Sequence, residues 1–265
     1  MIPRAYIDAW RSTAPWQQDS QVEQDLVISR ALIQIFSHDL LREHLAFRGG
    51  TALHKLFLHP QARYSEDIDL VQLKEQRIGP ILKAIRDQLQ FLGGEDDRQV
   101  ESSDHNWTIY YSFETENPPP PEMRVKIEIN TREHFNILDL NEINFSIDNR
   151  WYSGETDIIT YQPEELLGTK LRALYQRKKG RDLFDLHYAL SHLEVDTDKI
   201  IDCFREYMKQ NDIKPPTGRE FELNMQEKME DREFTGDIEA LLRSGIEYDH
   251  HQAYDHIHKK LIQNI

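Results

Sequence analysis

The chain has 265 residues, enough for one large domain or two modest ones, and its formal net charge of −15 disfavours sequence-independent binding to nucleic acid over most of its surface. An RNA partner would therefore need a local basic patch. Cys203 is the only cysteine, no apolar run approaches the roughly 20 residues that span a bilayer, and the first residues lack a secretory signal, so we expect a cytoplasmic protein.

The first predicted elements are a helix, a strand and a second helix. Apolar residues recur near helical spacing over residues 21–45, which predicts an amphipathic helix that covers a sheet. Residues 45–48 form a short extended run that ends at a pair of glycines. Thr51 then suits the N-cap of a helix over residues 52–58.

The next segments alternate between extended and helical patterns. Ile68, Leu70 and Leu73 lie near a second extended segment, and a helix is expected over residues 78–92 because Gly93 and Gly94 follow it.

Two β-rich runs, residues 107–113 and 124–130, predict an antiparallel pair of strands. The segment from Pro118 to Pro121 between them can only be a loop. A last short strand is predicted at residues 158–161.

The remaining chain has a helical period. Pro163 suits a first helical turn, two acids follow it, and leucines then recur at helical spacing. We therefore predict an α/β (α+β) fold in which residues 1–161 form an α/β domain with an N-terminal helical cover. Residues 162–265 are expected to form a helical C-terminal domain.

Two aspartates carry the chemistry that the sequence suggests. If their segment is a strand, Asp67 and Asp69 share one face while Ile68 and Leu70 point into the core. Like charges so close together destabilise the strand unless a cation binds between them, and a hard divalent ion would do so. An acid-x-acid pair in a strand is, however, more often a solvated face than a metal site.

A later strand repeats this arrangement. Val125, Ile127 and Ile129 form an apolar face, and Lys126 and Glu128 lie on the polar one. Glu128 can therefore be a third carboxylate, and three acids on neighbouring strands can hold one or two Mg²⁺ ions that clamp a triphosphate. The Gly49-Gly50-Thr51 turn would offer backbone N–H groups to phosphate.

The joint pattern resembles the AbiEii/AbiGii-type nucleotidyltransferase toxins of type IV toxin–antitoxin and abortive-infection systems. The resemblance covers about residues 45–190. It rests on Phe47–Leu53, Arg63–Leu70, Lys126–Ile129, Glu165–Leu174 and Arg177–Leu186.

This resemblance implies a fold and an activity. The fold would be a polymerase-β-like nucleotidyltransferase domain with a small mixed sheet, followed by a helical domain. The activity would be Mg²⁺-dependent transfer of a nucleoside monophosphate from an NTP to an acceptor, the 3′ end of a tRNA, with release of pyrophosphate. A cognate antitoxin would be a further partner. Two alternatives are transfer to a protein hydroxyl and a non-catalytic module that binds nucleotide or antitoxin.

The resemblance also assigns roles to individual residues. The metal would be held by Asp67, Asp69 and Glu128, where the wider superfamily often has aspartate in place of the glutamate. The catalytic set adds Lys170, which would neutralise phosphate charge, and Asp182, which would help in positioning or proton transfer. The nucleotide-binding candidates are Gly49, Gly50, Thr51, Ser65, Lys126 and Lys170.

A basic run extends from Lys170 to Arg181 with no acid in it. It is either a solvated helix end or a surface on which Arg177, Lys178 and Lys179 meet an RNA backbone. Asp182, which follows, could alternatively cap a helix.

Overall fold

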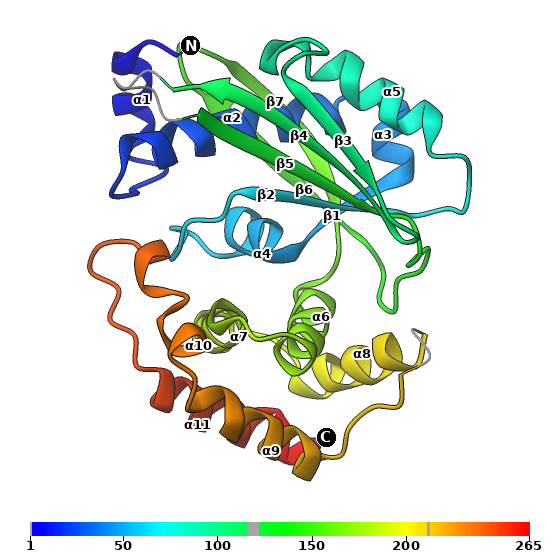
Figure 1. Cartoon of the computed structure of the whole chain (residues 1–265), viewed down its shortest axis with the longest axis vertical. Coiled ribbons are helices and arrows are strands. Elements are labelled where there is room, and N and C mark those ends of the chain that lie inside the picture. The colour runs from blue at the N-terminus through cyan, green and yellow to red at the C-terminus, as the bar shows by residue number, and fades with distance from the viewer. Residues whose placement is uncertain (1, 116–121, 211–212) are drawn as a thin grey trace. The chain divides into compact units, whose positions relative to one another are not determined.

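A computed structural model describes residues 2–115, 122–210 and 213–265 (Figure 1). The chain forms two compact units, Met1–Tyr161 and Gln162–Ile265, which we call the α/β unit and the helical unit. The loop predicted for Pro118 to Pro121 lies outside the described residues.

In the described part of the α/β unit, a seven-stranded mixed sheet has the strand order β3-β4-β5-β2-β1-β7-β6. The strands are β1 (Leu45–Arg48), β2 (Asp67–Gln72), β3 (Arg98–Ser102), β4 (Asn106–Glu114), β5 (Glu122–Asn130), β6 (Asn141–Asp148) and β7 (Ser153–Thr160). Two neighbouring pairs, β2 with β5 and β1 with β7, run parallel, and the other pairs run antiparallel.

Five strands of the sheet, β1, β2, β4, β5 and β7, correspond to predicted strands. The sheet also contains two strands that were not predicted. β4 and β5 pair in antiparallel fashion, as expected. The additional strands are β3 and β6, which lie at the two edges of the sheet. β3 has no buried residue and no apolar alternation, as is common at a sheet edge. β6, in contrast, alternates Ile143, Phe145 and Ile147 with polar residues, a strand signal that was overlooked. β7 begins at Ser153, earlier than the predicted residue 158.

The helices of the α/β unit differ from the predicted ones mainly in their bounds. They are α1 (Arg4–Trp10), α2 (Asp19–Phe36), α3 (Asp39–His44), α4 (Gly49–Ala52), the π-helical turn η1 (Leu53–Phe57), α5 (Gly79–Gln88) and the 3₁₀ turn η2 (Gln90–Leu92). The single helix predicted over residues 21–45 is therefore two helices, because the chain turns at Ser37 and His38.

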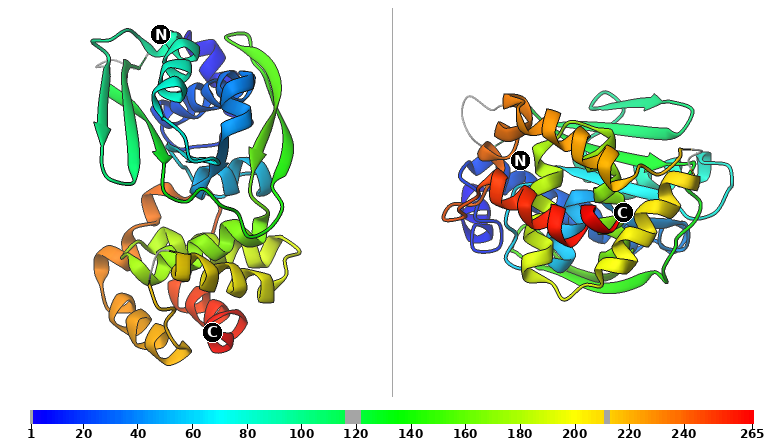
Figure 2. Two further views of the ribbon diagram at one scale, coloured as in Figure 1. Left: turned by 90° about the vertical axis from the view of Figure 1, so that its right-hand side faces the viewer. Right: turned by 90° about the horizontal axis from the view of Figure 1, so that it is seen from below.

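The core of this unit lies between the helices and one face of the sheet. α2 packs against β7, β5 and β6. In the left view of Figure 2, the blue helices lie between strands at the two ends of the sheet, which curves around them. Ile68 and Leu70 of β2 and Ile127 of β5 are almost completely buried. The intervening positions of these strands carry the polar residues.

The helical unit begins with Pro163 at the first position of a helix, as predicted. Its elements are α6 (Pro163–Gln176), α7 (Gly180–His192), α8 (Thr197–Gln210), α9 (Gly218–Met229), α10 (Arg232–Gly236), η3 (Glu239–Leu241), α11 (His250–Lys260) and η4 (Ile262–Asn264). α6 and α8 cross closely at Gly168, where an added Cβ would lie 2.6 Å from Cβ of Cys203. This crossing buries the thiol. No described helix has the length and apolar character needed to cross a membrane.

Candidate active site

Three predicted carboxylates lie together on the α/β unit. Asp69 on β2 is directly opposite Glu128 on β5, and Asp67 is opposite Lys126. Neighbouring strands are about 4.8 Å apart, and side chains two residues apart on a strand point to the same face. Asp67, Asp69 and Glu128 therefore share a small area on the face opposite Ile68, and we call these three residues the carboxylate cluster.

Lys126 lies within this area. Its Nζ is 2.8 Å from Oε2 of Glu128 and 4.0 Å from Oδ2 of Asp67, and the side chains of Asp67, Lys126 and Glu128 are 37%, 29% and 30% exposed. Burial alone would lower the pKa of Lys126, but the hydrogen bond to Glu128 and the nearby acidic charges outweigh it and raise the pKa above its usual value. Lys126 is thus a partly exposed cation that is paired with the carboxylate cluster.

Asp69 has a raised pKa. Its burial, followed by the charges of Asp67 and Glu128, raises its pKa to about 6, although Arg48 and Lys126 act in the opposite direction. Burial and the two neighbouring carboxylates together therefore outweigh the two cations at Asp69. A bound divalent cation would favour its ionised form.

Gly49 makes the turn beside the cluster possible. Its φ is +81°, and a Cβ on it would lie only 2.1 Å from Oδ2 of Asp69. A side chain at this position would thus be strained and would collide with the carboxylate. Backbone and carboxylate therefore meet directly at this point.

Thr51 does not have the role of N-cap that its sequence position suggested. The helix begins at Gly49, and Arg48 occupies the cap position, because the glycine turn lets the strand pass directly into helix. Thr51 is buried inside the first turn, next to Gly50, and its Oγ1 is 2.8 Å from Oγ of Ser65. Two of the predicted nucleotide-binding side chains thus contact each other.

The donors of the cluster are of the kind that magnesium prefers. Across residues 2–115, 122–210 and 213–265, no three acidic, histidine or cysteine side chains are already arranged to enclose a metal ion. Mg²⁺, however, is commonly bound through one or two carboxylates together with substrate phosphates, not by a cage made only of protein. Asp67 and Asp69 supply such carboxylates next to the glycine turn, so the donor set fits this ion.

Lys170 and Asp182 lie together in the helical unit. Nζ of Lys170 is 2.9 Å from Oδ1 of Asp182 and 2.8 Å from Oδ2 of Asp185, and all three side chains are buried. Arg177 Nε is 2.7 Å from Oδ2 of Asp182. The charge of Lys170, which we predicted to neutralise phosphate, is thus already balanced inside its own unit.

The position of Asp182 excludes the helix-cap alternative, because Lys179 occupies the N-cap of α7. Burial alone would raise the pKa of Asp182, but the charges of Lys170 and Arg177 and their hydrogen bonds hold it below its usual value. Asp182 is thus a buried, ionised and well-paired carboxylate.

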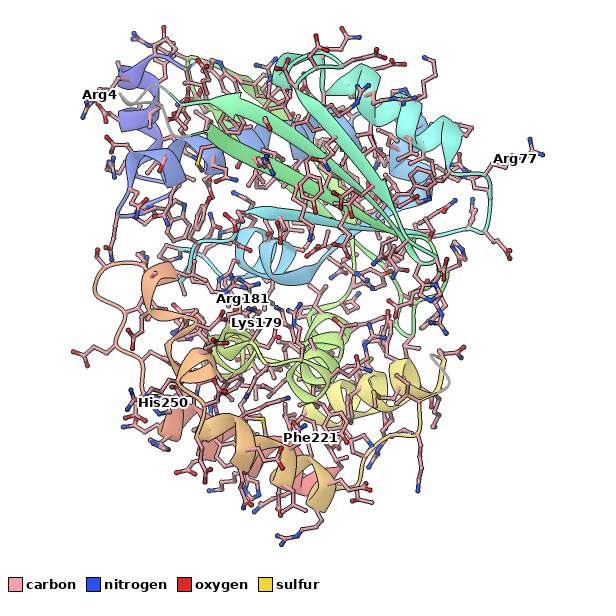
Figure 3. All side chains as sticks on the ribbon, in the orientation of Figure 1. Arg4, Arg77, Lys179, Arg181, Phe221 and His250 are labelled. Carbon is pink, nitrogen blue, oxygen red and sulfur yellow. The ribbon has the colours of Figure 1, made fainter. Side chains whose placement is uncertain are left out.

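The basic run also has acidic partners, which come from distant parts of the sequence. Lys178 is ion-paired with Asp231, and Asp237 lies 3.8 Å from Lys179 and 4.0 Å from Arg181. Figure 3 labels Lys179 and Arg181, which lie close together at the start of α7. The run is therefore not the uncompensated positive patch that its local sequence suggested.

Sequence reasoning missed a buried ionic network on the α/β unit. Lys55 Nζ is 2.8 Å from Oδ2 of Asp25 and 3.0 Å from Oγ of Ser29, and the indole nitrogens of Trp10 and Trp16 also donate to Asp25. The available signal was Asp25, an acid within the apolar face of a predicted helix. A buried acid needs partners, so this position could have predicted the network.

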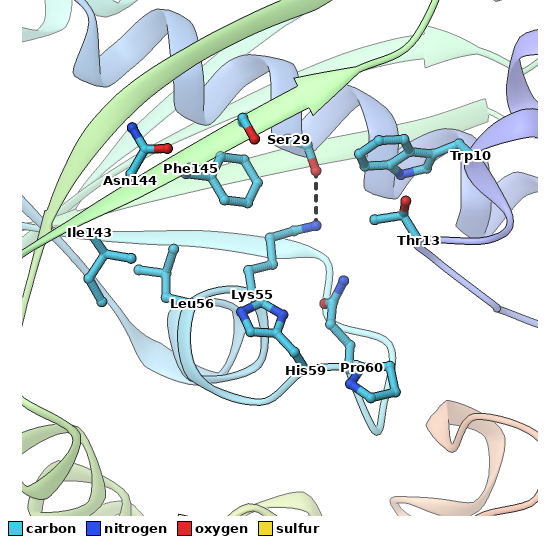
Figure 4. A pocket seen from close by; sticks show the side chains of 12 residues that line it. Trp10, Thr13, Ser29, Lys55, Leu56, His59, Pro60, Ile143, Asn144 and Phe145 are labelled. Carbon is cyan, nitrogen blue, oxygen red and sulfur yellow. Dashed lines mark hydrogen bonds between the residues drawn. The ribbon is translucent and has the colours of Figure 1, made fainter.

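This network adjoins a cavity of about 250 Å³ (Figure 4). Lys55, Ser29, Phe145 and Asn144 contribute to its wall. None of the described residues that line it carries a carboxylate, so it is separate from the carboxylate cluster.

Comparisons with known proteins identify the family and a similar fold. A family model described as "Nucleotidyl transferase AbiEii toxin, Type IV TA system" matches residues 30–260. The fold is similar to that of MenT4, a nucleotidyltransferase toxin from Mycobacterium tuberculosis H37Rv, with a TM-score of 0.67, 15% sequence identity, and coverage of 100% of this chain and 91% of that chain.

A second solved structure, an antigenic nucleotidyltransferase-like protein from Paracoccidioides brasiliensis, matches with a TM-score of 0.40 and 16% identity over 71% of this chain and 94% of that chain. No curated protein sequence matches the chain.

Proposed function

Because the chain belongs to the AbiEii family of nucleotidyltransferase toxins of type IV toxin–antitoxin systems, we propose that it transfers a nucleoside monophosphate from an NTP to the 3′ end of a tRNA. The family implies an NTP substrate and an antitoxin partner. The observation that carries the proposal is the pairing of Asp69 with Glu128 beside Asp67, which concentrates three carboxylates at the end of the glycine turn.

The proposed reaction is a displacement at the α-phosphorus of the NTP. The acceptor hydroxyl oxygen forms a bond to this phosphorus, and the bond from the phosphorus to the oxygen that bridges to the β-phosphate breaks. Pyrophosphate leaves with the electron pair of that bond. Glu128 is the proposed acceptor of the hydroxyl proton, because it lies on the side of the cluster away from the glycine turn.

Asp67 and Asp69, with Glu128, are the proposed ligands of one or two Mg²⁺ ions. When bound, the metal would supply positive charge to the phosphate oxygens and to the departing pyrophosphate. The strand register supports this assignment, since it places Asp69 next to both Asp67 and Glu128, and adjacent carboxylates repel each other unless a cation lies between them.

The triphosphate is proposed to bind at the turn from Gly49 to Thr51, with Ser65 and Lys126 beside it. The close approach of the Gly49 backbone to Asp69 supports this, because phosphates bound there would lie next to the metal ligands. Lys126 can turn from Glu128 toward a phosphate, since its side chain is partly exposed.

Lys170 and Asp182 have a different proposed role from the residues of the carboxylate cluster. We propose that they act in positioning, by fixing α6 against α7, because their charges are paired and buried together. Contact of Arg177, Lys178 and Lys179 with RNA stays a prediction, and their acidic partners limit how much each can contribute.

The test is incubation of the purified chain with each labelled NTP, Mg²⁺ and total tRNA. Label on RNA is the expected result. Label on protein would instead identify a protein hydroxyl as acceptor, and no label with any NTP would favour a non-catalytic binding module. The Asp67→Asn, Asp69→Asn double variant controls for contaminating activity.

A further inference from the structure

The carboxylate cluster continues as two rows of side chains across the sheet. One row joins Asp69 on β2 and Glu128 on β5 to Thr108 on β4, because Thr108 is directly opposite Glu128. The second row joins Asp67 and Lys126 in the same way to a residue of β4, Tyr110, which is opposite Lys126.

These β4 side chains lie on the same face as the carboxylates. Residues directly opposite each other in paired strands point to the same side of a sheet. The intervening residues Ile109 and Tyr111 are almost completely buried, whereas Thr108 and Tyr110 are partly exposed. The polar surface around the carboxylate cluster therefore includes an aromatic ring about two strand spacings, or roughly 10 Å, from the β2 aspartates.

The outer strand of this hairpin extends the same surface. Gln99 of β3 is opposite Tyr110, and Glu101 is opposite Thr108. Nε2 of Gln99 donates to Oε1 of Glu101 at 2.8 Å, and both residues are exposed. On this face Tyr110 thus lies between Gln99 on one neighbouring strand and Lys126 on the other, while the carboxylate of Glu101 disfavours a phosphate at the sheet edge.

The order of strands separates the two sides of the proposed reaction. The glycine turn follows β1, which lies on one side of β2, and β5 and β4 lie on the other side. In phosphoryl transfer, the attacking and leaving oxygens are roughly in line on opposite sides of the phosphorus. If the triphosphate lies at Gly49 to Thr51, pyrophosphate departs on the β1 side, and the acceptor must approach over β5 and β4.

We propose that the β3–β4 hairpin is the binding platform for the 3′-terminal nucleotide of an acceptor RNA, with Tyr110 stacking on its base. The inference rests on the proposed function and names the acceptor subsite of that same active site. Base stacking on aromatic rings is the common way in which proteins hold single-stranded nucleic acid ends. Lys126 lies between Tyr110 and the carboxylates, so the ring adjoins the cation that we propose to contact the NTP.

Two independent readouts test this inference. The first is steady-state transfer of label, with KM measured separately for tRNA and for the NTP. The second is equilibrium binding of a fluorescent single-stranded RNA oligonucleotide, measured by anisotropy without NTP. Three variants are compared, namely Tyr110→Ala, Tyr110→Phe and the matched control Phe113→Ala, which removes a ring from the opposite face of the same strand. Circular dichroism and thermal unfolding check that each variant is folded.

We expect Tyr110→Ala to raise the KM for tRNA and the Kd for the oligonucleotide by at least about fivefold, the low end for loss of one base–aromatic stack. The KM for the NTP should stay within twofold. Tyr110→Phe should restore both values because it retains the ring, and Phe113→Ala should leave them unchanged.

The outcomes separate the inference from the function on which it rests. If Tyr110→Ala leaves the KM for tRNA and the binding of the oligonucleotide unchanged, the inference is overturned. Transfer of label to tRNA by the wild type would still support the proposed function. A change confined to the KM for the NTP would also overturn it. If the wild type binds RNA but transfers no label, the function fails, and weaker binding by Tyr110→Ala still supports the RNA platform. A wild type that does not bind the oligonucleotide, or that labels only protein, overturns the inference.

Discussion

The two units each gather acids and a lysine, but with opposite electrostatic results. In the α/β unit, Asp69 shares its surroundings with two further carboxylates, and its pKa is raised to about 6 by burial and by their charges. In the helical unit, Asp182 is more deeply buried than Asp69, but its pKa is lowered because Lys170 and Arg177 outweigh burial.

We interpret this difference as that between a proposed ligand-binding site and a cluster whose charges are already paired. A carboxylate whose pKa is raised is held in an unfavourable charged state, and perturbed groups of this kind are concentrated at functional sites. A buried carboxylate with its cations in contact already has its partners, and removing one of them leaves an uncompensated charge. Variants in the two clusters test this contrast.

Substitution of either β2 aspartate should remove transfer activity. We expect Asp67→Asn or Asp69→Asn to lower kcat/KM on the order of 10³-fold, since a metal contributes several kcal/mol of charge stabilisation. Label transfer to tRNA measures the effect, and Asp148→Asn on the edge strand β6 is the control with the same change in charge. An Asp69→Asn protein with full activity would remove the contrast between the two clusters.

Loss of the buried lysine should destabilise the helical unit. Lys170→Met leaves two buried carboxylates without their common partner, which should reduce the free energy of unfolding by about 3–5 kcal/mol. Urea denaturation followed by circular dichroism gives this value. Lys178→Met, which breaks a half-exposed pair with Asp231, should cost less than about 1 kcal/mol. Equal losses in the two variants would contradict the assignment of a structural role to Lys170.

Asp69→Asn should stabilise the metal-free protein, and the gain should depend on pH. The folded-state pKa of Asp69 is about 6, above the unfolded value of 3.8, so the folded state holds its proton more tightly. The wild type therefore loses stability as pH rises from about 4 to 6, by at most about 3 kcal/mol, and regains it on acidification. The variant lacks this loss.

Urea denaturation at pH 4.0 and pH 7.5 with EDTA should thus show a stabilising effect of Asp69→Asn at the higher pH only. Asp182→Asn is the matched comparison, and its effect on stability should have the opposite sign. Its folded-state pKa is lowered, so its carboxylate stabilises the fold above the unfolded pKa, and the variant should be less stable at pH 7.5. The same sign for both variants at pH 7.5 would refute the electrostatic distinction.

The smallest effect is expected in the basic run. Because Lys178 and Lys179 are already close to Asp231 and Asp237, the double variant Lys178→Glu, Lys179→Glu should raise the KM for tRNA by less than about fivefold. The KM for the NTP should not change. A much larger rise in the KM for tRNA would show that the run contacts RNA despite its acidic partners.

β2 and β5, the strands that carry the carboxylates, could be predicted because each has an alternation of apolar and polar residues within its own short segment. The alternation of Ile68 and Leu70 with the two aspartates follows from one buried face, and β5 has the same periodicity. Since β2 and β5 run parallel next to each other, Asp69 and Glu128 fall at the same level of the sheet. β3 escaped prediction because it buries no side chain and so leaves no pattern, whereas Ile143, Phe145 and Ile147 of β6 do alternate with polar residues and could have revealed that strand.

Charge balance could not be predicted in the same way. Lys178 and Asp231 are 53 residues apart, and Lys55 and Asp25 are 30 apart, so no local window contains both partners. The basic run therefore looked uncompensated. The start of α4 was misplaced for another reason, since the left-handed conformation of Gly49 lets a helix begin without the side-chain cap that Thr51 suggested.

The close crossing of α6 and α8 at Gly168 has a practical consequence for measurements on this protein. It encloses Cys203, and burial raises the pKa of this thiol to about 12, so very little reactive thiolate forms at neutral pH. A cysteine introduced on the surface would then be the principal target of a maleimide dye in the native protein. A single fluorophore on β3 could thus report the arrival of RNA in real time, with the natural thiol left in place.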